Sequence, residues 1–187
     1  MVSDHQLPSA GAHGLPDAPS AWVVRWGRQV PVQGRVLDVA CGGGRHARWF
    51  AAQGHAVDAV DRNADALATL AQVANVTPLC ADIESGAWPY ARGVYAAVVV
   101  TNYLHRALFP TLLDALCGGG VLIYETFAAG NERFGRPANP DFLLKPGELL
   151  EVVRGRLRVQ AYEDLVVDAP RPASVQRICA VYETNSA

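Results

Sequence analysis

Short continuous apolar runs alternate along this chain with stretches whose apolar residues recur at helical spacing. The runs predict strands of a buried parallel sheet, and the spaced stretches predict helices that pack on it. The expected strands cover 36–39, 55–60, 76–80, 94–100 and 121–125. The expected helices cover 21–30, 45–53, 64–73, 108–117 and 145–153. This alternation is typical of an α/β fold.

The two ends of the chain break the alternation in different ways. Residues 1–19 are rich in Ser, Gly, Pro and Ala without periodicity, which predicts a flexible N-terminal arm. Two apolar stretches near the other end, 156–165 and 174–183, follow each other with no helix between them. Such a pair must be antiparallel. We therefore expect one domain over residues 20–187.

Three consecutive glycines, Gly42 to Gly44, separate the first strand from its helix. Glycines let the backbone approach a ligand closely, and the first N–H groups of the helix then face that ligand. This pattern fits a dinucleotide fingerprint, a methyltransferase motif, or a tight turn without a ligand. Asp38, inside the first strand, favours the methyltransferase. A buried carboxylate there would be paired by the ammonium of a methionyl group, whereas it would repel a pyrophosphate.

Further candidate cofactor contacts follow the next strands. Asp61, 19 residues after Gly42, ends the second strand beside the glycine turn, where it could accept hydrogen bonds from ribose hydroxyls or cap the next helix. Asp82 could accept from an adenine amine while Ile83 packs on the ring, although a solvated turn acid is an alternative. The full set of predicted cofactor contacts is Asp38, Ala40, Gly42, Gly44, Arg45, Asp61, Arg62, Asp82, Ile83 and Asn102.

Candidate residues for binding and activating a methyl acceptor follow the fourth and fifth strands. Polar residues 101–106 follow a central strand, which is where open α/β sheets bind ligands. Tyr103 and His105 are the candidate catalytic residues, needed only if an acceptor arrives protonated. The long irregular stretch 126–140 predicts a lid. Arg106, Arg133 and Arg136 could hold an anionic acceptor; the alternative is that the last two pair with surface acids.

Composition narrows the function classes. The chain has 187 residues, is 50% hydrophobic and 18% charged, and carries a net charge of −2. These values exclude a disordered or fibrous protein and give no general attraction to nucleic acid or anionic membranes. Its four cysteines are widely spaced, which argues against disulfides and against a metal site. With no signal-peptide pattern and no long apolar run, we expect a cytoplasmic protein.

The motifs resemble those of a known superfamily. The segments 36–45, 60–61, 81–82 and 118–122 match, in order and spacing, the motifs of class I S-adenosylmethionine-dependent methyltransferases. Within that superfamily, Cys-Gly-x-Gly-Arg and the compact length are most similar to the small bacterial tellurite-resistance-type enzymes. The resemblance extends over residues 21–183.

This resemblance implies a doubly wound, Rossmann-like, seven-stranded sheet of order 3-2-1-4-5-7-6 with an antiparallel C-terminal strand. It also implies S-adenosylmethionine as cofactor and direct methyl transfer to a small-molecule acceptor such as an anion or a thiol. No Asn-Pro-Pro-Tyr-like motif follows the fourth strand, so a nucleobase amine is not the expected acceptor. An NAD-dependent oxidoreductase and a non-catalytic cofactor-binding protein stay as alternatives, and the oligomeric state is left open.

Overall fold

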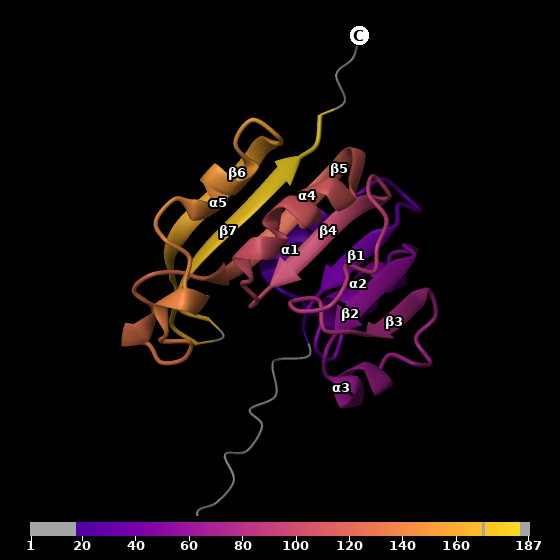
Figure 1. The fold of residues 1–187 in the computed structure, drawn as a ribbon, viewed down its shortest axis with the longest axis horizontal. Helices are drawn as coiled ribbons and strands as arrows, with labels where there is room; N and C mark the ends of the chain where they lie inside the picture. The colour runs from indigo at the N-terminus through magenta and orange to yellow at the C-terminus, as the bar shows by residue number, and fades with distance from the viewer. Residues whose placement is uncertain (1–17, 170, 184–187) are drawn as a thin grey trace, which may run out of the picture.

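The computed structural model describes residues 18–169 and 171–183 and is organised around one seven-stranded sheet (Figure 1). Its strands are β1 (Val36–Val39), β2 (Val57–Asp61), β3 (Val76–Cys80), β4 (Tyr95–Thr101), β5 (Leu116–Phe127), β6 (Arg158–Val167) and β7 (Ala173–Val181). They lie in the order β3-β2-β1-β4-β5-β7-β6. The predicted order is thus confirmed. Most of the predicted N-terminal arm, residues 1–17, lies outside the described residues.

The strand directions also follow the prediction. β1 pairs in parallel with β2 and β4, β3 extends the sheet beyond β2, and β5 lies parallel to β4. β7 runs antiparallel to both β5 and β6. Every residue of β1 and the first six of β4 are buried, because helices cover both faces of the sheet at its centre. Full burial explains the continuous apolar runs.

Helices cover the sheet on both faces (Figure 1). They are α1 (Ala21–Gly27), α2 (Arg45–Ala52), α3 (Ala64–Ala68), α4 (Phe109–Ala115) and α5 (Glu148–Val153), with short 3-10 turns η1 (Arg106–Leu108), η2 (Asn131–Arg133) and η3 (Pro140–Phe142). One apolar core contains Leu112 of α4 and Leu149 of α5. The other contains Trp22 of α1, Phe50 of α2 and Leu67 of α3.

The largest departure from the predicted elements lies at the junction of α4 and β5. A helix was expected over 108–117 and a strand from 121, but α4 ends at Ala115 and β5 begins at Leu116. Leu116 pairs with Tyr95, and a register shift follows before Ala97 pairs with Val121. Pairing across the sheet therefore overrides the helical spacing. The helices expected over 21–30, 64–73 and 145–153 are also shorter than predicted.

The first helix and the last strand meet on one face of the sheet. The indole Nε1 of Trp22 donates a 3.4 Å hydrogen bond to the carbonyl oxygen of Ile178. The guanidinium of Arg177 lies 4.8 Å from the centre of the Trp22 ring and also contacts the carboxylate of Glu125 in β5. These contacts join the two ends of the described chain across β5 and β7. Within the described part of the chain, no helix has both the length and the apolar character needed to cross a membrane.

Candidate functional site

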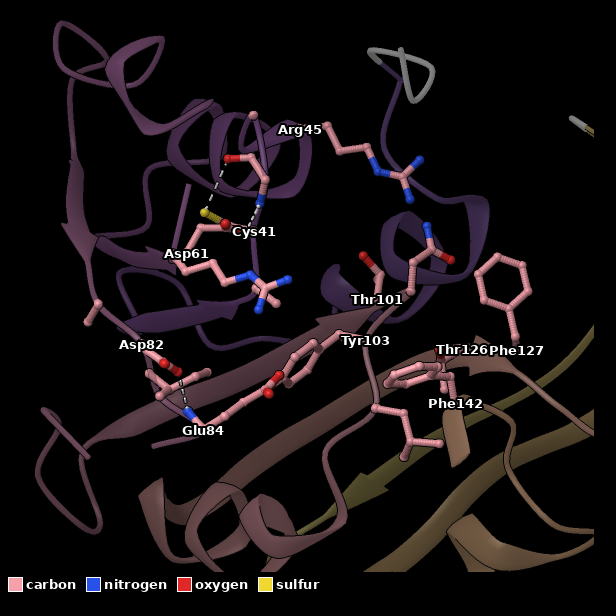
Figure 2. Close-up of a pocket in the computed structure, with 18 of the residues that line it drawn as sticks. Cys41, Arg45, Asp61, Asp82, Glu84, Thr101, Tyr103, Thr126, Phe127 and Phe142 are labelled. Atoms are coloured by element: carbon pink, nitrogen blue, oxygen red, sulfur yellow. Dashed lines mark hydrogen bonds between the residues drawn. The ribbon is translucent and has the colours of Figure 1, made fainter. Parts of the chain in front are cut away.

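A cavity of about 980 Å³ opens at the carboxyl ends of the parallel strands. Its walls come from the glycine turn after β1, the ends of β2 and β4, the loop after β3, and the segment that follows β5. In Figure 2, Cys41, Asp61, Asp82 and Glu84 lie on one side, and Arg45, Thr101, Thr126, Phe127 and Phe142 lie on the other. Open α/β sheets bind their ligands at this edge, and the volume is that of a small-molecule site.

The glycine turn forms an open cradle in this cavity. Gly42 has a φ of +54°, and a Cβ built at Gly42 or Gly43 would meet no atom within 4 Å. Such a Cβ would project into the free space of the cavity. Gly44 differs, because its Cβ would lie 2.5 Å from two methyl carbons of Leu70. Of the two predicted glycine contacts, Gly42 therefore lines the cavity, whereas Gly44 is required for packing between α2 and the chain after α3.

Asp61 lies beside the glycine turn, as the parallel pairing of β1 and β2 requires. Its Oδ2 accepts a 2.7 Å hydrogen bond from the backbone N–H of Gly42, and Oδ1 accepts one of 2.9 Å from the N–H of Asn63. Each carboxylate oxygen has a second lone pair, so Asp61 can still accept from a ligand. Arg62, next along the chain, also lines the cavity.

Asp38 lies beneath the cavity wall. Its side chain is 1% exposed, and Oδ2 accepts a 2.9 Å hydrogen bond from the N–H of Ala47 in α2. Oδ1 has no partner among the described residues. Burial raises the pKa of this carboxyl to about 7. Asp38 thus holds α2 against β1, and its predicted contact with a methionyl ammonium stays a prediction.

The loop after β3 brings Asp82, Ile83 and Glu84 to one end of the cavity. The Oδ2 of Asp82 accepts a 2.6 Å hydrogen bond from the Ser85 hydroxyl, and Oδ1 accepts one of 2.9 Å from the N–H of Glu84. These bonds lower the pKa of Asp82 and keep it ionised. Ile83 is buried and presents an apolar surface beside the acid.

The residues after β4 divide between the cavity and its surroundings. Asn102, with a φ of +54°, and Tyr103 line the cavity. The Tyr103 hydroxyl is buried without a hydrogen-bond partner among the described residues. Burial and the neighbouring Glu84 carboxylate raise its pKa, so it stays a neutral phenol. His105 lies outside the lining, with its Nδ1 3.9 Å from the Glu84 carboxylate.

The three predicted substrate arginines lie outside the lining. Arg106 donates to the Glu148 carboxylate at 2.7 and 3.0 Å and to the carbonyl oxygens of Asp141 and Leu143. Arg133 donates to the Gly130 carbonyl oxygen, and its guanidinium lies 5.6 Å from the Phe134 ring centre. Arg136 is exposed. Their predicted role has no support in these contacts.

The segment after β5 does reach the cavity, through other residues. We call residues 131–142 the roof segment. It contributes Pro137 and Phe142 to the lining, next to Phe127 at the end of β5. Phe142 is 54% exposed, which is unusual for a phenylalanine. That this segment reaches the cavity was predictable from its place after a strand, whereas its apolar lining residues were not, because the segment has no periodic pattern. Its action as a lid stays a prediction.

Arg45 closes one rim of the cavity together with the chain before α1. Its Nη1 donates a 3.2 Å hydrogen bond to the Ala18 carbonyl oxygen, and it forms no ion pair with the described residues. Burial lowers the pKa of the neighbouring His46 to about 3, so its neutral Nε2 accepts from the Ser20 N–H at 3.1 Å. The Ser20 hydroxyl donates to Glu125 at 2.7 Å. These contacts fix the start of the described chain at the cavity.

Two further observations bear on the chemistry of the lining. Cys41 lines the cavity, but burial raises the pKa of its thiol, so it stays protonated. Among the described residues, no group of three or more His, Cys, Asp or Glu side chains could hold a metal ion.

Comparison with known proteins favours one of the three interpretations of the glycine turn, the methyltransferase motif. Residues 36–120 match the family described as "Methyltransferase domain". This chain carries a class I methyltransferase domain. The match includes β1, the glycine turn, Asp61, Asp82 and β4, and the sheet order is that of the class. The domain match and the fold support S-adenosylmethionine as the cofactor and give no support to the NAD-dependent alternative.

Solved structures of low sequence identity share the methyltransferase fold. TehB from Haemophilus influenzae is 18% identical with a TM-score of 0.73; the match covers 86% of this chain but only 61% of TehB. A TehB-like S-adenosylmethionine-dependent methyltransferase from Corynebacterium glutamicum is 17% identical, with a TM-score of 0.62 and coverage of 87% and 88%.

A third solved structure shares the fold and contains the demethylated cofactor. It is geranyl diphosphate C-methyltransferase from Streptomyces coelicolor A3(2), in complex with Mg²⁺, geranyl diphosphate and S-adenosyl-L-homocysteine. It is 17% identical with a TM-score of 0.64, and the match covers 87% of this chain and 80% of that one. A search of curated protein sequences gave no match.

Proposed function

We propose that this methyltransferase acts on a small-molecule acceptor that binds beside the cofactor in the one cavity described above. The observation that carries the proposal is the division of that cavity. One side presents the glycine cradle and ionisable side chains suited to the cofactor, and the other presents hydroxyls and apolar rings beneath the roof segment.

The cofactor side fits S-adenosylmethionine residue by residue. We assign Asp61 to the ribose hydroxyls, and Asp82 and Ile83 to the amine and the face of the adenine, because all three line the cavity. The open cradle at Gly42 and Gly43 leaves room for the ligand to lie against the backbone. Tyr103 lies near Asp82 and Glu84, at this same end, which favours a wall of the adenine site over a catalytic role.

Arg45 is the cation best placed for the methionyl carboxylate. It lines the cavity on the side opposite Asp82, and it has no carboxylate partner among the described residues (Figure 2). A carboxylate would form a charge-assisted, potentially bidentate hydrogen bond with this half-buried guanidinium. The cofactor would then extend from Asp82 past Asp61 and the glycine cradle to Arg45.

The protein's part in the reaction is to position the two reactants. The bound cofactor supplies an electrophilic methyl group on a sulfonium. The cavity walls hold the acceptor against it and exclude water, which reduces the entropic cost of the encounter. His105 lies outside the lining, so proton abstraction by this residue has no support in its position.

The roof segment favours a small acceptor. Pro137 and Phe142 line the cavity together with Phe127, so a macromolecular acceptor would have to displace them to reach it. The net charge of −2 gives no general attraction to nucleic acid or membrane. Cys41, Cys80, Cys117 and Cys179 are free thiols, which supports the predicted cytoplasmic location.

Calorimetric titration with S-adenosylhomocysteine and NADH in parallel tests the cofactor assignment. We expect S-adenosylhomocysteine alone to bind. Asp61→Ala should weaken that binding by about 2 to 4 kcal/mol, the cost of lost charge-assisted hydrogen bonds. Asp65→Ala is the matched control, because Asp65 is an exposed acid in the first turn of α3 that does not line the cavity.

Labelled methyl donor then tests the acceptor size. Incubation with a cell extract divided by ultrafiltration should label only the low-molecular-mass fraction. Label in the macromolecular fraction alone would contradict a small acceptor.

In the calorimetric test, equal affinity of wild type and Asp61→Ala for S-adenosylhomocysteine would show that Asp61 is not part of the cofactor site.

A further inference from the structure

The acceptor side of the cavity is apolar and aromatic. Phe127, Phe142 and Thr126 lie together on the side away from Asp61 and Asp82 (Figure 2). Pro137 completes this wall. The Phe142 side chain stays 54% exposed at the cavity, so an apolar ligand packed against it would remove hydrophobic surface from water. The wall therefore suits a ligand with an apolar body.

Apart from Arg45, the charged side chains of the cavity lie away from this wall. Asp61, Asp82 and Glu84 lie on the opposite side, and Arg45 is assigned above to the methionyl carboxylate. Arg48 donates to the carbonyl oxygen of Thr69, on the α3 side of the glycine turn. Arg62 also lines the cavity, but on the cofactor side, near enough to Asp82 and Tyr103 to affect their pKa values. Among the described lining residues, Arg45 is therefore the one charged side chain drawn on the same side as the aromatic wall. An acceptor with a fixed charge on its body, away from the atom that meets the sulfonium, would lose hydration there without gaining a partner.

The same wall offers no general base. Elsewhere in the lining, Tyr103 and Cys41 stay protonated because burial raises their pKa values. Thr101 and Thr126 can donate or accept hydrogen bonds but do not ionise. The acceptor must therefore reach its nucleophilic form in water. A thiol, with a pKa of about 8.5, does so far more readily than a phenol, with a pKa of about 10, or an alcohol.

We propose that the acceptor is a small, uncharged thiol with an apolar body that packs against Phe127 and Phe142. This inference rests on the proposed function. The thiol loses its proton to solvent, and the thiolate lone pair forms the new sulfur–carbon bond. The bond between the methyl group and the sulfonium breaks with its electron pair retained by the cofactor sulfur. The products are a methyl thioether, S-adenosylhomocysteine and one proton.

The first test uses three acceptors of matched shape: thiophenol, phenol and benzoate. Formation of S-adenosylhomocysteine is measured for each on wild-type protein. We expect turnover with thiophenol and at least 100-fold lower kcat/KM with phenol and benzoate. 2-Mercaptoethanesulfonate, a thiol with a fixed negative charge, should also be a poor acceptor because the wall is apolar.

The second test compares two exposed phenylalanines of the roof segment. Phe142→Ala should raise the KM for thiophenol about tenfold and leave the affinity for S-adenosylhomocysteine unchanged. Phe134 is 42% exposed in the same segment but does not line the cavity, so Phe134→Ala should change neither value. Both side chains are solvent-exposed, so neither variant is expected to unfold.

The possible failures are distinguishable. If S-adenosylhomocysteine does not bind, the proposed function itself fails. If it binds but no thiol is methylated, or if benzoate or phenol is preferred, the thiol proposal is overturned and the cofactor assignment stands. Equal kinetics for Phe142→Ala and Phe134→Ala would place the acceptor away from this wall.

Discussion

Gly42 and Gly44, which belong to the same turn, have different roles. Gly42 faces open space in the cavity, whereas Gly44 lies against Leu70. Both have positive φ values, +54° and +73°, so any side chain there also costs backbone strain. The motif G-x-G alone does not distinguish a ligand contact from a packing contact, because both demand the absence of a Cβ.

We predict that Gly44→Ala loses stability and that Gly42→Ala loses cofactor binding. The Gly44 variant should lower the free energy of unfolding by about 2 to 4 kcal/mol through the clash with Leu70 and the positive φ. The Gly42 variant should lose only about 1 to 2 kcal/mol but bind S-adenosylhomocysteine more weakly. Urea unfolding and calorimetry separate the two effects. The reverse pattern would contradict the packing described for this turn.

Asp38 should make the unliganded protein less stable as the pH rises. In the folded protein the pKa of Asp38 is raised from 3.8 to about 7, mainly by burial. The hydrogen bond from Ala47 and the positive charge of Arg45 lower it, but by less. The contribution of Asp38 to stability is thus full below about pH 4 and is lost as the pH rises towards 7. Asp38→Asn keeps the acceptor for the Ala47 N–H but cannot ionise. The stability of this variant relative to wild type should therefore increase between pH 4 and pH 8. A constant difference would show that folding does not raise the pKa of Asp38.

At the scale of single residues, the sequence predicts the cavity residues at the ends of the strands but not those in the roof segment. Asp61, Asp82 and Asn102 could be placed at the cavity because the carboxyl ends of parallel strands share one edge. Phe142 arrives through a 3-10 turn in a segment without periodicity, so no local signal marks it. The arginines were conspicuous in sequence, yet Arg106 and Arg133 contact neighbouring loop atoms.

At the scale of elements, Arg106 joins three pieces of chain. Its guanidinium contacts Glu148 at the start of α5 and the carbonyl oxygens of Asp141 and Leu143, at the end of the roof segment. Lys145 N–H donates to the same Glu148 carboxylate. The pair therefore anchors one end of the roof segment to η1 and α5.

A double-mutant cycle tests this anchor against the predicted substrate role. Arg106→Ala and Glu148→Ala should each lower the free energy of unfolding by about 1 to 3 kcal/mol, and the double variant should lose little more than either alone. Both should raise the KM for an acceptor to a similar extent, because both loosen the roof segment. An Arg106 variant that loses acceptor affinity while Glu148→Ala keeps it would instead identify Arg106 as a substrate contact.

Element boundaries were less predictable than element types. The helical spacing at 108–117 continued past the true end of α4, because Leu116 is apolar in either structure. Its pairing with Tyr95 is a contact between distant residues that no short window of sequence contains. The strand order, by contrast, came from the resemblance, and the antiparallel pair β6 and β7 came from the missing helix between them.

At the scale of the whole molecule, Trp22 should be the most costly single side chain among those that join the ends of the chain. It is 2% exposed, donates to Ile178 and stacks under Arg177. Trp22→Ala should lower the free energy of unfolding by about 3 to 5 kcal/mol, measured by urea denaturation. Val32→Ala, at a position 87% exposed, is the control and should change stability little. A small effect of the Trp22 variant would mean that α1 is not part of the cooperative unit.

The contact between Trp22 and β7 also fixes an order of events during synthesis. α1 leaves the ribosome first, but its partners Arg177 and Ile178 are added more than 150 residues later. β5 likewise lacks its neighbour on one side until β7 is made. The nascent chain must therefore carry an uncovered indole, and later an unpaired edge of β5, until β7 is added, and such surfaces bind chaperones or other chains.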